Sequence, residues 1–193
     1  MHPPDWPPAW DHRIKRYLQL GGQDQAETRA QAIWLEALDL AQPASWHDII
    51  PMNDFLRMFA PYAQASQALQ RLLEGCGQVA LMTVSLGARI EESAADLFAR
   101  HEAFAGFMLD RMGGYLAEWC MSSLDQQVTQ SLEARDVRAT RRYSPGYKDF
   151  SLEAQKIFVE LAGHAIPGLK LGPGNLLLPE KSITAVKGFS SSP

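Results

Sequence analysis

The stretch VALMTVSL at residues 79–86 decides the fold of this chain. It is largely apolar and partly β-branched, and Gly77 and Gly87 bound it on either side. A short apolar run between such breakers is typical of a strand whose two faces are both buried. We therefore expect a buried β-strand here.

Two helices are expected directly after this strand, at residues 91–100 and at about 102–134. The longer helix carries a stripe of large apolar side chains at helical spacing, which is typical of a surface that packs into the core. The stripe consists of Phe104, Phe107, Met108, Met112, Tyr115, Leu116 and Trp119. We interpret it as core and assign no ligand to it.

The rest of the chain indicates shorter elements. The pattern predicts further helices at residues 11–20, 25–40, 66–74 and 151–161. It predicts further strands at residues 46–50, 137–143, 169–171 and 182–189. Ser151 is the expected cap of the last helix. Within residues 25–40, one apolar face is expected to contain Ile33, Leu35, Leu38 and Leu40.

Helices outnumber strands, and the strands do not alternate regularly with them. That mixture favours an α+β fold over a doubly wound parallel sheet. We expect a single domain at residues 11–190, with a twisted, mainly antiparallel sheet surrounded by helices. Residues 1–10 contain four prolines and two tryptophans, so we expect them to form an extended arm.

Composition argues against several classes of protein. Hydrophobic residues make up 46% of the chain, yet no apolar run approaches the roughly 18 residues that a membrane helix needs. The N-terminus lacks the basic start and apolar stretch of a signal peptide, so a cytoplasmic location is expected. A net charge of −4 argues against a nucleic-acid partner. The two cysteines, Cys76 and Cys120, form no CxxC motif, which argues against a disulfide scaffold or a cysteine metal site.

The common catalytic motifs are missing from the sequence. It contains no glycine-rich dinucleotide fingerprint, phosphate loop, GxSxG elbow or HExxH motif. Its five histidines show no i, i+4 pair that would suggest metal ligation. A conventional hydrolase or dehydrogenase therefore has little support.

One segment, RYSPGY at residues 142–147, combines a defined turn with useful chemistry. Pro145 fixes φ and Gly146 accepts a positive φ, so the segment is suited to a type II turn. The missing Cβ of Gly146 also lets a ligand approach the backbone. Arg142 can present a planar fork to a carboxylate, and Tyr147 offers an aromatic face. Such a turn could hold an amino-acid ligand, but the residues alone leave open a surface turn with an incidental arginine.

This segment resembles the signature Arg-x-(Ser/Ala)-Pro-Gly-Tyr of the activation domain of cobalamin-dependent methionine synthase, where it lines the S-adenosylmethionine site. Three other stretches are similar to that family in the same order and spacing. They are the apolar strand at residues 79–87, LDRMGGYLAE at 109–118 and LPEKSITAVKG at 178–188. The similarity spans most of residues 11–190 and implies the fold of that domain and a reactivation function.

The resemblance also implies how S-adenosylmethionine would be bound. Glu118 would receive the ammonium group of the ligand, and Arg142 would receive its carboxylate. Ser144 and Gly146 would offer backbone groups. Tyr147 would lie near the methyl group of the ligand and the face of the corrinoid.

The implied reaction needs a partner protein. Cob(II)alamin would be reduced and trapped by methylation from S-adenosylmethionine, which the protein holds over the cobalt. The chain lacks the cobalamin motif Asp-x-His-x-x-Gly and is too short for a methyl-transferring barrel of about 250 residues. Cobalamin would therefore arrive on a separate corrinoid-binding protein or methionine synthase subunit. A flavodoxin-type donor would supply the electron, and no membrane partner is expected.

Some positions depart from the family pattern. Gly114 stands where the family often has an acidic residue, and LGPG at residues 171–174, with Pro173, replaces Leu-Thr-Glu-Ser. The N-terminal aspartate of the synthase domain has only weak counterparts here, Asp5 and Asp11. Fewer polar partners predict weaker or altered ligand binding. The alternative function is a non-catalytic binding and assembly module for a corrinoid methyltransferase that has lost S-adenosylmethionine binding.

A basic cluster surrounds the signature segment and consists of Arg135, Arg138, Arg141 and Arg142. It could help to dock an acidic partner or the phosphate of the cofactor. Strand alternation would place Arg138 and Arg142 on one face and Arg141 on the other. A solvated edge strand is the alternative reading for Arg135 and Arg141.

Overall fold

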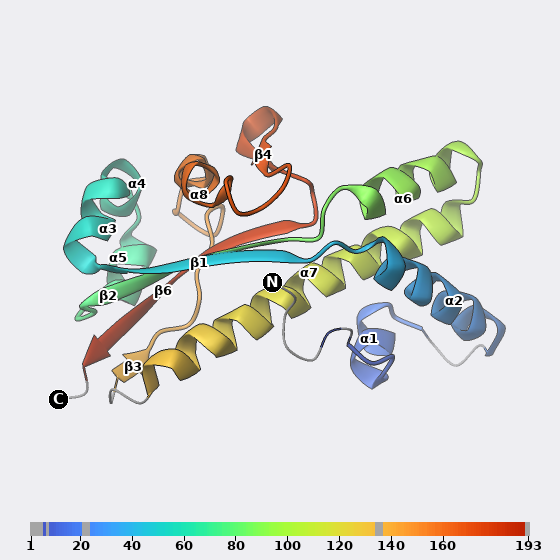
Figure 1. Cartoon of the computed structure of the whole chain (residues 1–193), viewed down its shortest axis with the longest axis horizontal. Helices are drawn as coiled ribbons and strands as arrows, with labels where there is room; N and C mark the ends of the chain where they lie inside the picture. Colours follow the sequence, from blue (N-terminus) through green and yellow to red (C-terminus); the bar gives the residue numbers. More distant parts are fainter. Residues whose placement is uncertain (1–5, 7, 21–23, 134–136, 192–193) are drawn as a thin grey trace.

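The computed structural model describes residues 6, 8–20, 24–133 and 137–191. At its centre lies a four-stranded sheet in which all neighbouring strands are antiparallel. In sheet order the strands are β1 (Ala44–Pro51), β2 (Gln78–Ser85), β6 (Ser182–Ser191) and β3 (Val137–Ala139). Helices lie on both faces of this sheet (Figure 1). The expected α+β architecture is therefore confirmed.

Strand β2 lies inside the sheet, between β1 and β6. All of its residues except the first are buried. Ala80, Met82 and Val84 contribute to one hydrophobic cluster, whereas Val79 and Leu81 contribute to another. Because alternate side chains of a strand point to opposite faces, the two clusters lie on opposite sides of the sheet. The prediction of a strand buried on both faces is confirmed.

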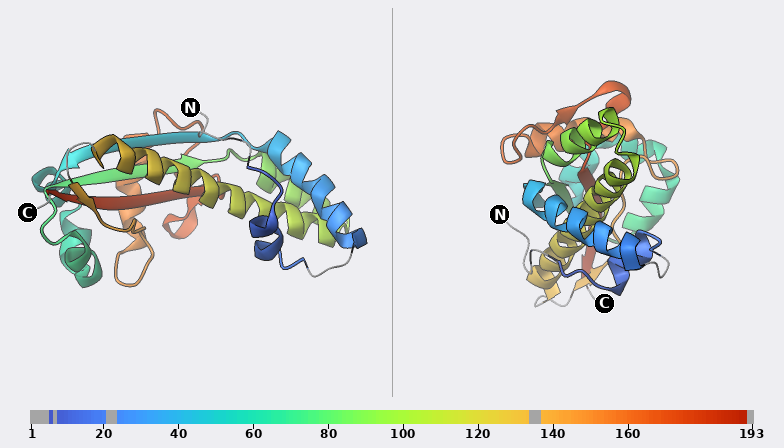
Figure 2. Two further views of the ribbon diagram at one scale, coloured as in Figure 1. Left: turned by 90° about the horizontal axis from the view of Figure 1, so that it is seen from below. Right: turned by 90° about the vertical axis from the view of Figure 1, so that its right-hand side faces the viewer.

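One face of the sheet is covered by α7 (Ala103–Glu133), which packs against β2, β6 and β3. The N-terminal half of α7 extends beyond the sheet (Figures 1 and 2). Three further helices lie around that half: α1 (His12–Tyr17), α2 (Asp24–Leu40) and α6 (Arg89–Ala99). The sheet and this helical end together give the molecule an elongated shape (Figure 2).

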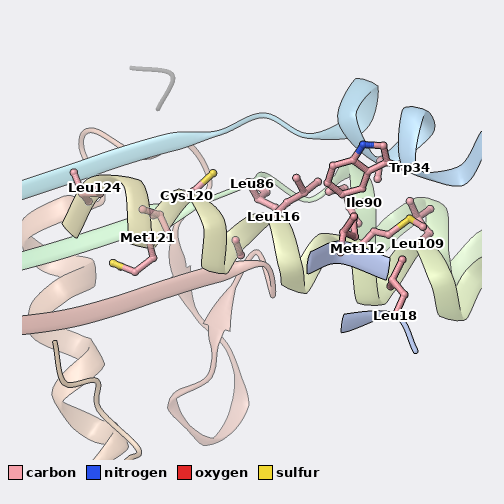
Figure 3. Close-up of a cluster of buried hydrophobic side chains, with 14 of the residues drawn as sticks. Leu18, Trp34, Leu86, Ile90, Leu109, Met112, Leu116, Cys120, Met121 and Leu124 are labelled. Carbon is pink, nitrogen blue, oxygen red and sulfur yellow. The ribbon is translucent and has the colours of Figure 1, made fainter. Parts of the chain in front are cut away.

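The core between α7 and its neighbours follows much of the predicted stripe. Met112 and Leu116 of α7 are buried and pack in one cluster with Trp34 of α2 and Ile90 of α6 (Figure 3). Phe107 does not belong to this core, because 52% of its surface is exposed. It directly precedes the buried Met108, and one position along a helix turns a side chain by about 100°.

The boundaries of the N-terminal helices differ slightly from the prediction. α1 begins after Asp11, whose side chain accepts hydrogen bonds from the backbone of Arg13 and Ile14, and it ends at Tyr17. In α2, Ile33 is buried, but Leu35 is 64% exposed and was wrongly assigned to the apolar face. Two positions along a helix differ by about 200°, so Ile33 and Leu35 cannot share a narrow face.

The opposite face of the sheet is covered by short helices, namely α3 (Met52–Met58), α4 (Ala60–Ala65), α5 (Gln67–Leu73), η1 (Leu152–Ala154) and α8 (Gln155–Ala162). Phe59 lies at the centre of their packing, since it stacks on Phe55 at 4.7 Å and meets Phe158 edge-on at 5.5 Å. The sequence did not predict α3 and α4. Both are short, and unlike α1 and α5 neither is followed closely by a glycine that marks a helix end.

A small hairpin completes the described part of the chain. It pairs β4 (Lys170–Leu171) with β5 (Leu177–Leu178), and the 3-10 turn η2 (Pro173–Asn175) lies between them. Only the first of these strands was expected. Within the described residues, none of the helices combines the length and the apolar character that crossing a bilayer requires.

Two adjacent glycines in α7 provide a test of the close packing between α7 and α6. A Cβ at Gly113 would come 2.8 Å from Cγ2 of Ile90, whereas a Cβ at Gly114 would meet only the Tyr17 hydroxyl, at 3.2 Å. We expect Gly113→Ala to lower the free energy of unfolding by about 1–2 kcal/mol, because overpacking outweighs the gain in helix propensity. Gly114→Ala should raise it by up to about 1 kcal/mol. Urea denaturation of both variants measures this difference, and equal effects would contradict the contact.

Candidate functional site

The candidate site begins where the chain leaves the sheet after β3. Residues 137–143 were expected to form one strand, but β3 ends at Ala139. Two hydrogen bonds connect Thr140 to Gly188. The N–H of Thr140 donates to the carbonyl of Gly188, and Oγ1 of Thr140 accepts from the N–H of Gly188. The chain returns to the sheet only at Tyr143, through an isolated bridge to Val186. The expected strand alternation of the arginines therefore does not apply to Arg142.

The turn that follows has the predicted form. The N–H of Tyr147 donates to the carbonyl of Ser144 at 3.2 Å, and Gly146 has a φ of +90°. A positive φ at the third position of such a turn is the mark of type II. Two further hydrogen bonds close the loop, from the N–H of Gly146 to the carbonyl of Phe150 and from the N–H of Phe150 to the carbonyl of Tyr147.

Tyr143 anchors this loop to the core. It is only 7% exposed, and its ring stacks on Phe150 at a centroid distance of 6.1 Å. Burial raises the pKa of the Tyr143 hydroxyl above its ordinary value. The hydroxyl therefore stays protonated, and it donates a hydrogen bond to the carbonyl of Tyr147 at 3.2 Å. The backbone on both sides of the turn is thus fixed.

Arg142 and Glu118 meet next to the turn. Nη2 of Arg142 lies 2.6 Å from Oε2 of Glu118, which projects from α7. The Arg142 side chain is 29% exposed and that of Glu118 is 53% exposed. Nη1 of Arg142 is buried and has no hydrogen-bond partner in the described part of the chain. An acidic and a basic side chain are therefore close together, and the basic one has an unused donor.

A cavity of about 330 Å³ lies beside this ion pair. Its walls come from α7, from the loop after β3 and from β6. The lining residues are Glu118, Arg141, Arg142, Tyr143, Ser144, Tyr147, Lys148 and Ile183. Three cationic side chains and one carboxylate line the cavity, so its wall carries a net positive charge that favours an anionic group.

The predicted site residues fall into two groups. Glu118, Arg142, Ser144 and Tyr147 all line the cavity, and 61% of Tyr147 is exposed. Gly146 is not among the lining residues, and a Cβ there would point to Cδ1 of Leu152 at 3.1 Å. In the structure Gly146 therefore forms the turn and leaves room for the side chain of Leu152.

Sequence reasoning did not single out Lys148 or Ile183 as site residues. Ile183 lies in the stretch 178–188 that carried part of the resemblance, but nothing in the stretch marks it as a wall of the cavity. Lys148 directly follows the signature segment and has a φ of +49°, which is uncommon for a residue with a Cβ. That backbone conformation leaves no signal in the sequence.

A second, larger hollow of about 780 Å³ also reaches Glu118. It lies between the N-terminal segment, α1 and α7, and its other lining residues are Pro8, Ala9, Arg13, Tyr17, Tyr115, Trp119, Ser122, Ser123 and Gln126. Trp6 packs against the ring of Trp119 beside it, with centroids 5.9 Å apart. Glu118 thus stands where two hollows meet.

The positions that depart from the pattern of the similar family are not among the residues that line the first cavity. Gly114 faces Tyr17, and Pro173 lies in η2. Asp11 caps α1 and pairs with Arg13, so its carboxylate is already engaged. Asp5 and Arg135 lie outside the described residues.

The described residues offer little other chemistry. No three His, Cys, Asp or Glu side chains among them gather in a way that could hold a metal ion. Burial raises the pKa of the Cys120 thiol to about 12 and also raises the pKa of Cys76. A thiol that keeps its proton is a poor nucleophile, so neither cysteine suggests covalent catalysis.

Comparison with known proteins identifies a fold. No family model matches the chain, and no curated protein matches it by sequence. Among solved structures, the chain is similar to a crystal structure of the MetH reactivation domain bound to AdoHcy, with a TM-score of 0.57 and 15% sequence identity. The match covers 91% of this chain and 72% of the other. The resemblance that the four segments predicted is thus confirmed in three dimensions, and the chain has the fold of the MetH reactivation domain.

Proposed function

We propose that this chain binds S-adenosylmethionine in the cavity between Glu118 and Arg142. The observation that carries the proposal is the juxtaposition of these two side chains beside a cavity of about 330 Å³. It is supported by the fold, because the similar MetH domain was crystallised with AdoHcy bound. The same juxtaposition in a chain of another fold would suggest an amino-acid ligand but no particular one.

The two ends of an amino-acid group fit this pair of side chains. Arg142 binds the α-carboxylate through its planar fork, and Glu118 accepts from the α-ammonium. In the ligand-free protein the two side chains bind each other at 2.6 Å, so the ligand must separate them. Separation is helped by the buried Nη1 of Arg142, which gains an acceptor when the guanidinium turns toward a carboxylate.

Tyr147 is placed to act on the other charged group of the ligand. Its side chain is exposed and lines the same cavity as Arg142 and Glu118. A sulfonium is a cation, and an aromatic face attracts cations. Tyr147 therefore holds the sulfonium with its methyl group near the open side of the cavity. Ser144 contributes a backbone N–H at the wall.

We infer that the bound ligand serves reactivation of a corrinoid on another protein. A separate corrinoid-binding protein or methionine synthase subunit docks over the cavity and brings the cobalamin, and a flavodoxin-type protein supplies the electron. The corrinoid of that partner would supply the methyl-accepting chemistry: its reduced cobalt would take the methyl group of the sulfonium, and AdoHcy would leave. The task of this chain is to bind S-adenosylmethionine, orient its methyl group and keep it near the partner. This function places the protein in the cytoplasm.

Isothermal calorimetry with S-adenosylmethionine and with AdoHcy tests the ligand assignment. Both compounds carry the amino-acid group, so both should bind at a ratio of one per chain. Decarboxylated S-adenosylmethionine is the matched control, because it keeps the sulfonium but cannot use Arg142. If neither carboxylate-bearing compound gives heat, alone or with a corrinoid protein present, the ligand assignment is wrong.

A second function is favoured by the departures at Gly114 and Pro173. In this alternative the chain is a non-catalytic binding and assembly module for a corrinoid methyltransferase and has lost S-adenosylmethionine binding. The Arg142–Glu118 pair would then be a permanent contact between the loop and α7. Capture of a corrinoid protein to the same extent with and without S-adenosylmethionine, together with no heat in calorimetry, would favour this alternative.

A further inference from the structure

Asp149 connects the cavity loop to a helix that lies far away in the sequence. Its Oδ1 accepts a hydrogen bond from the Ser66 hydroxyl at 2.6 Å, and its Oδ2 accepts from the N–H of Ala68 at 3.2 Å. Ser66 is the N-cap of α5, and these contacts span more than 80 residues of chain. Asp149 itself is exposed and does not line the cavity.

The Ser66 hydroxyl is oriented toward Asp149 by its other hydrogen bond. Ser66 is fully buried, and its Oγ accepts from the N–H of Leu69 at 3.1 Å. The hydroxyl proton is then free to point at Oδ1 of Asp149. The hydrogen bond from Ser66 also lowers the pKa of the Asp149 carboxyl below its ordinary value. Asp149 is therefore ionised at neutral pH, and both of its oxygens are engaged.

The residue before Asp149 has a backbone that needs support. Lys148 has a φ of +49°, in the left-handed region that residues with a Cβ adopt at a cost. Such a conformation persists when the surrounding structure fixes it. Within the loop it is fixed by the type II turn, by the Phe150–Tyr147 hydrogen bond that spans Lys148, and by the buried Phe150 ring stacked on Tyr143. Asp149 adds a contact from the loop to α5.

We propose that Asp149 is a positioning residue, which holds Tyr147 and Lys148 against the ligand cavity through its contacts with Ser66 and Ala68. It touches no ligand. The identity of the ligand rests on the proposed function, whereas the positioning of the loop does not. Tyr147 and Lys148 both line the cavity, so a loop that leaves this conformation removes two walls of the site at once.

Comparing aspartate, asparagine and alanine at position 149 distinguishes the positioning of the loop from an effect on the stability of the whole protein. Asp149→Asn keeps a carbonyl oxygen for the Ser66 hydroxyl but loses the second acceptor, and Asp149→Ala loses both. Asp54→Ala is the control, because Asp54 is an exposed carboxylate that pairs with Arg57 in α3, away from the cavity. None of these substitutions changes Ser66 or Leu69, so the hydrogen bond from the N–H of Leu69 to Ser66 that caps α5 is expected to remain.

The first measurement is the affinity for S-adenosylmethionine. If Asp149→Ala leaves the loop in its binding conformation for a tenth of the time, the apparent Kd rises about tenfold. Asp149→Asn should lie between Asp149→Ala and the unchanged protein, and Asp54→Ala should bind like the unchanged protein. Equal affinity of all four proteins would overturn the positioning role.

The second measurement is amide hydrogen exchange by NMR, which needs no ligand. In Asp149→Ala the amides of Gly146, Tyr147 and Phe150 should exchange about tenfold faster, because their hydrogen bonds open with the loop. The amides of β2 should exchange at the same rate as before. Unchanged exchange in the loop overturns the proposal, and so does an equal increase in β2, which would indicate general destabilisation. Failure of the unchanged protein to bind S-adenosylmethionine would remove the proposed function but leave this measurement decisive.

Discussion

Replacement of Arg142 by alanine is expected to weaken S-adenosylmethionine binding by about 1.5–3 kcal/mol, the contribution of a hydrogen bond to a charged group. This corresponds to a Kd roughly 10 to 150 times higher. Arg142 is the cavity cation that combines partial burial with an unused donor. A carboxylate bound to Arg142 is therefore partly shielded from water. When Arg142 is replaced, water does not compensate for the hydrogen bonds that the carboxylate loses.

Two other substitutions control for charge and for position. Arg142→Lys keeps the charge but loses the planar fork, so its affinity should lie between those of Arg142→Ala and the unchanged protein. Arg141→Ala removes an exposed cation of the same cavity and should cost less than about 1 kcal/mol. Calorimetry and thermal unfolding of all three variants separate binding from stability. An unchanged affinity in Arg142→Ala would remove Arg142 from the site.

The fold was predictable where burial is continuous along the chain. β2 contains an unbroken apolar run, and α7 contains a long stripe of apolar residues at helical spacing. Both patterns are long enough to be recognised in the sequence, and both elements lie where they were expected. The strand predicted at residues 137–143 failed for a different reason. Val137–Ala139 pair with β6, but after Thr140 binds Gly188 the chain leaves the sheet and returns only at Tyr143.

The candidate site was predictable only in part. The type II turn could be expected, because Pro145 and Gly146 restrict φ locally and no distant residue is needed to form it. The cavity depends on elements that are distant in the sequence, since Ile183 approaches it from β6 and Glu118 from α7. The Ser66–Asp149 contact is of the same kind. No local pattern of residues specifies such pairs.

The four segments that carried the resemblance are close together in the structure. Residues 79–87 contain most of β2, 109–118 lie in α7, 142–147 contain the turn, and 178–188 contain most of β6. α7 packs on β2 and β6, and the turn is attached to β6 through Tyr143 and Val186. These segments therefore contribute six of the eight residues that line the cavity, all except Arg141 and Lys148.

A buried ion pair connects α7 to β6, and breaking it should have the largest effect on stability. Nζ of Lys187 lies 2.7 Å from Oδ1 of Asp125 and 2.7 Å from Oγ1 of Thr129, and the Lys187 side chain is 9% exposed. We expect Asp125→Ala to lower the free energy of unfolding by about 3 kcal/mol, because an unpaired lysine is left in the interior. This is near the lower end of the range for buried pairs, since Asp125 is 23% exposed.

Removing both charges should restore most of that stability. In the double variant Asp125→Ala with Lys187→Met no charge remains to be buried without a partner, so its unfolding free energy should approach that of the unchanged protein. Asp54→Ala, which breaks an exposed pair with Arg57, should cost less than about 1 kcal/mol. Urea denaturation of these variants measures all three values. Asp125 lies about two helical turns after Glu118 on the same side of α7, so the single variant should also weaken S-adenosylmethionine binding. If Asp125→Ala is no less stable than the double variant, then Lys187 finds water or another partner, and the ion pair does not fix α7 beside the cavity.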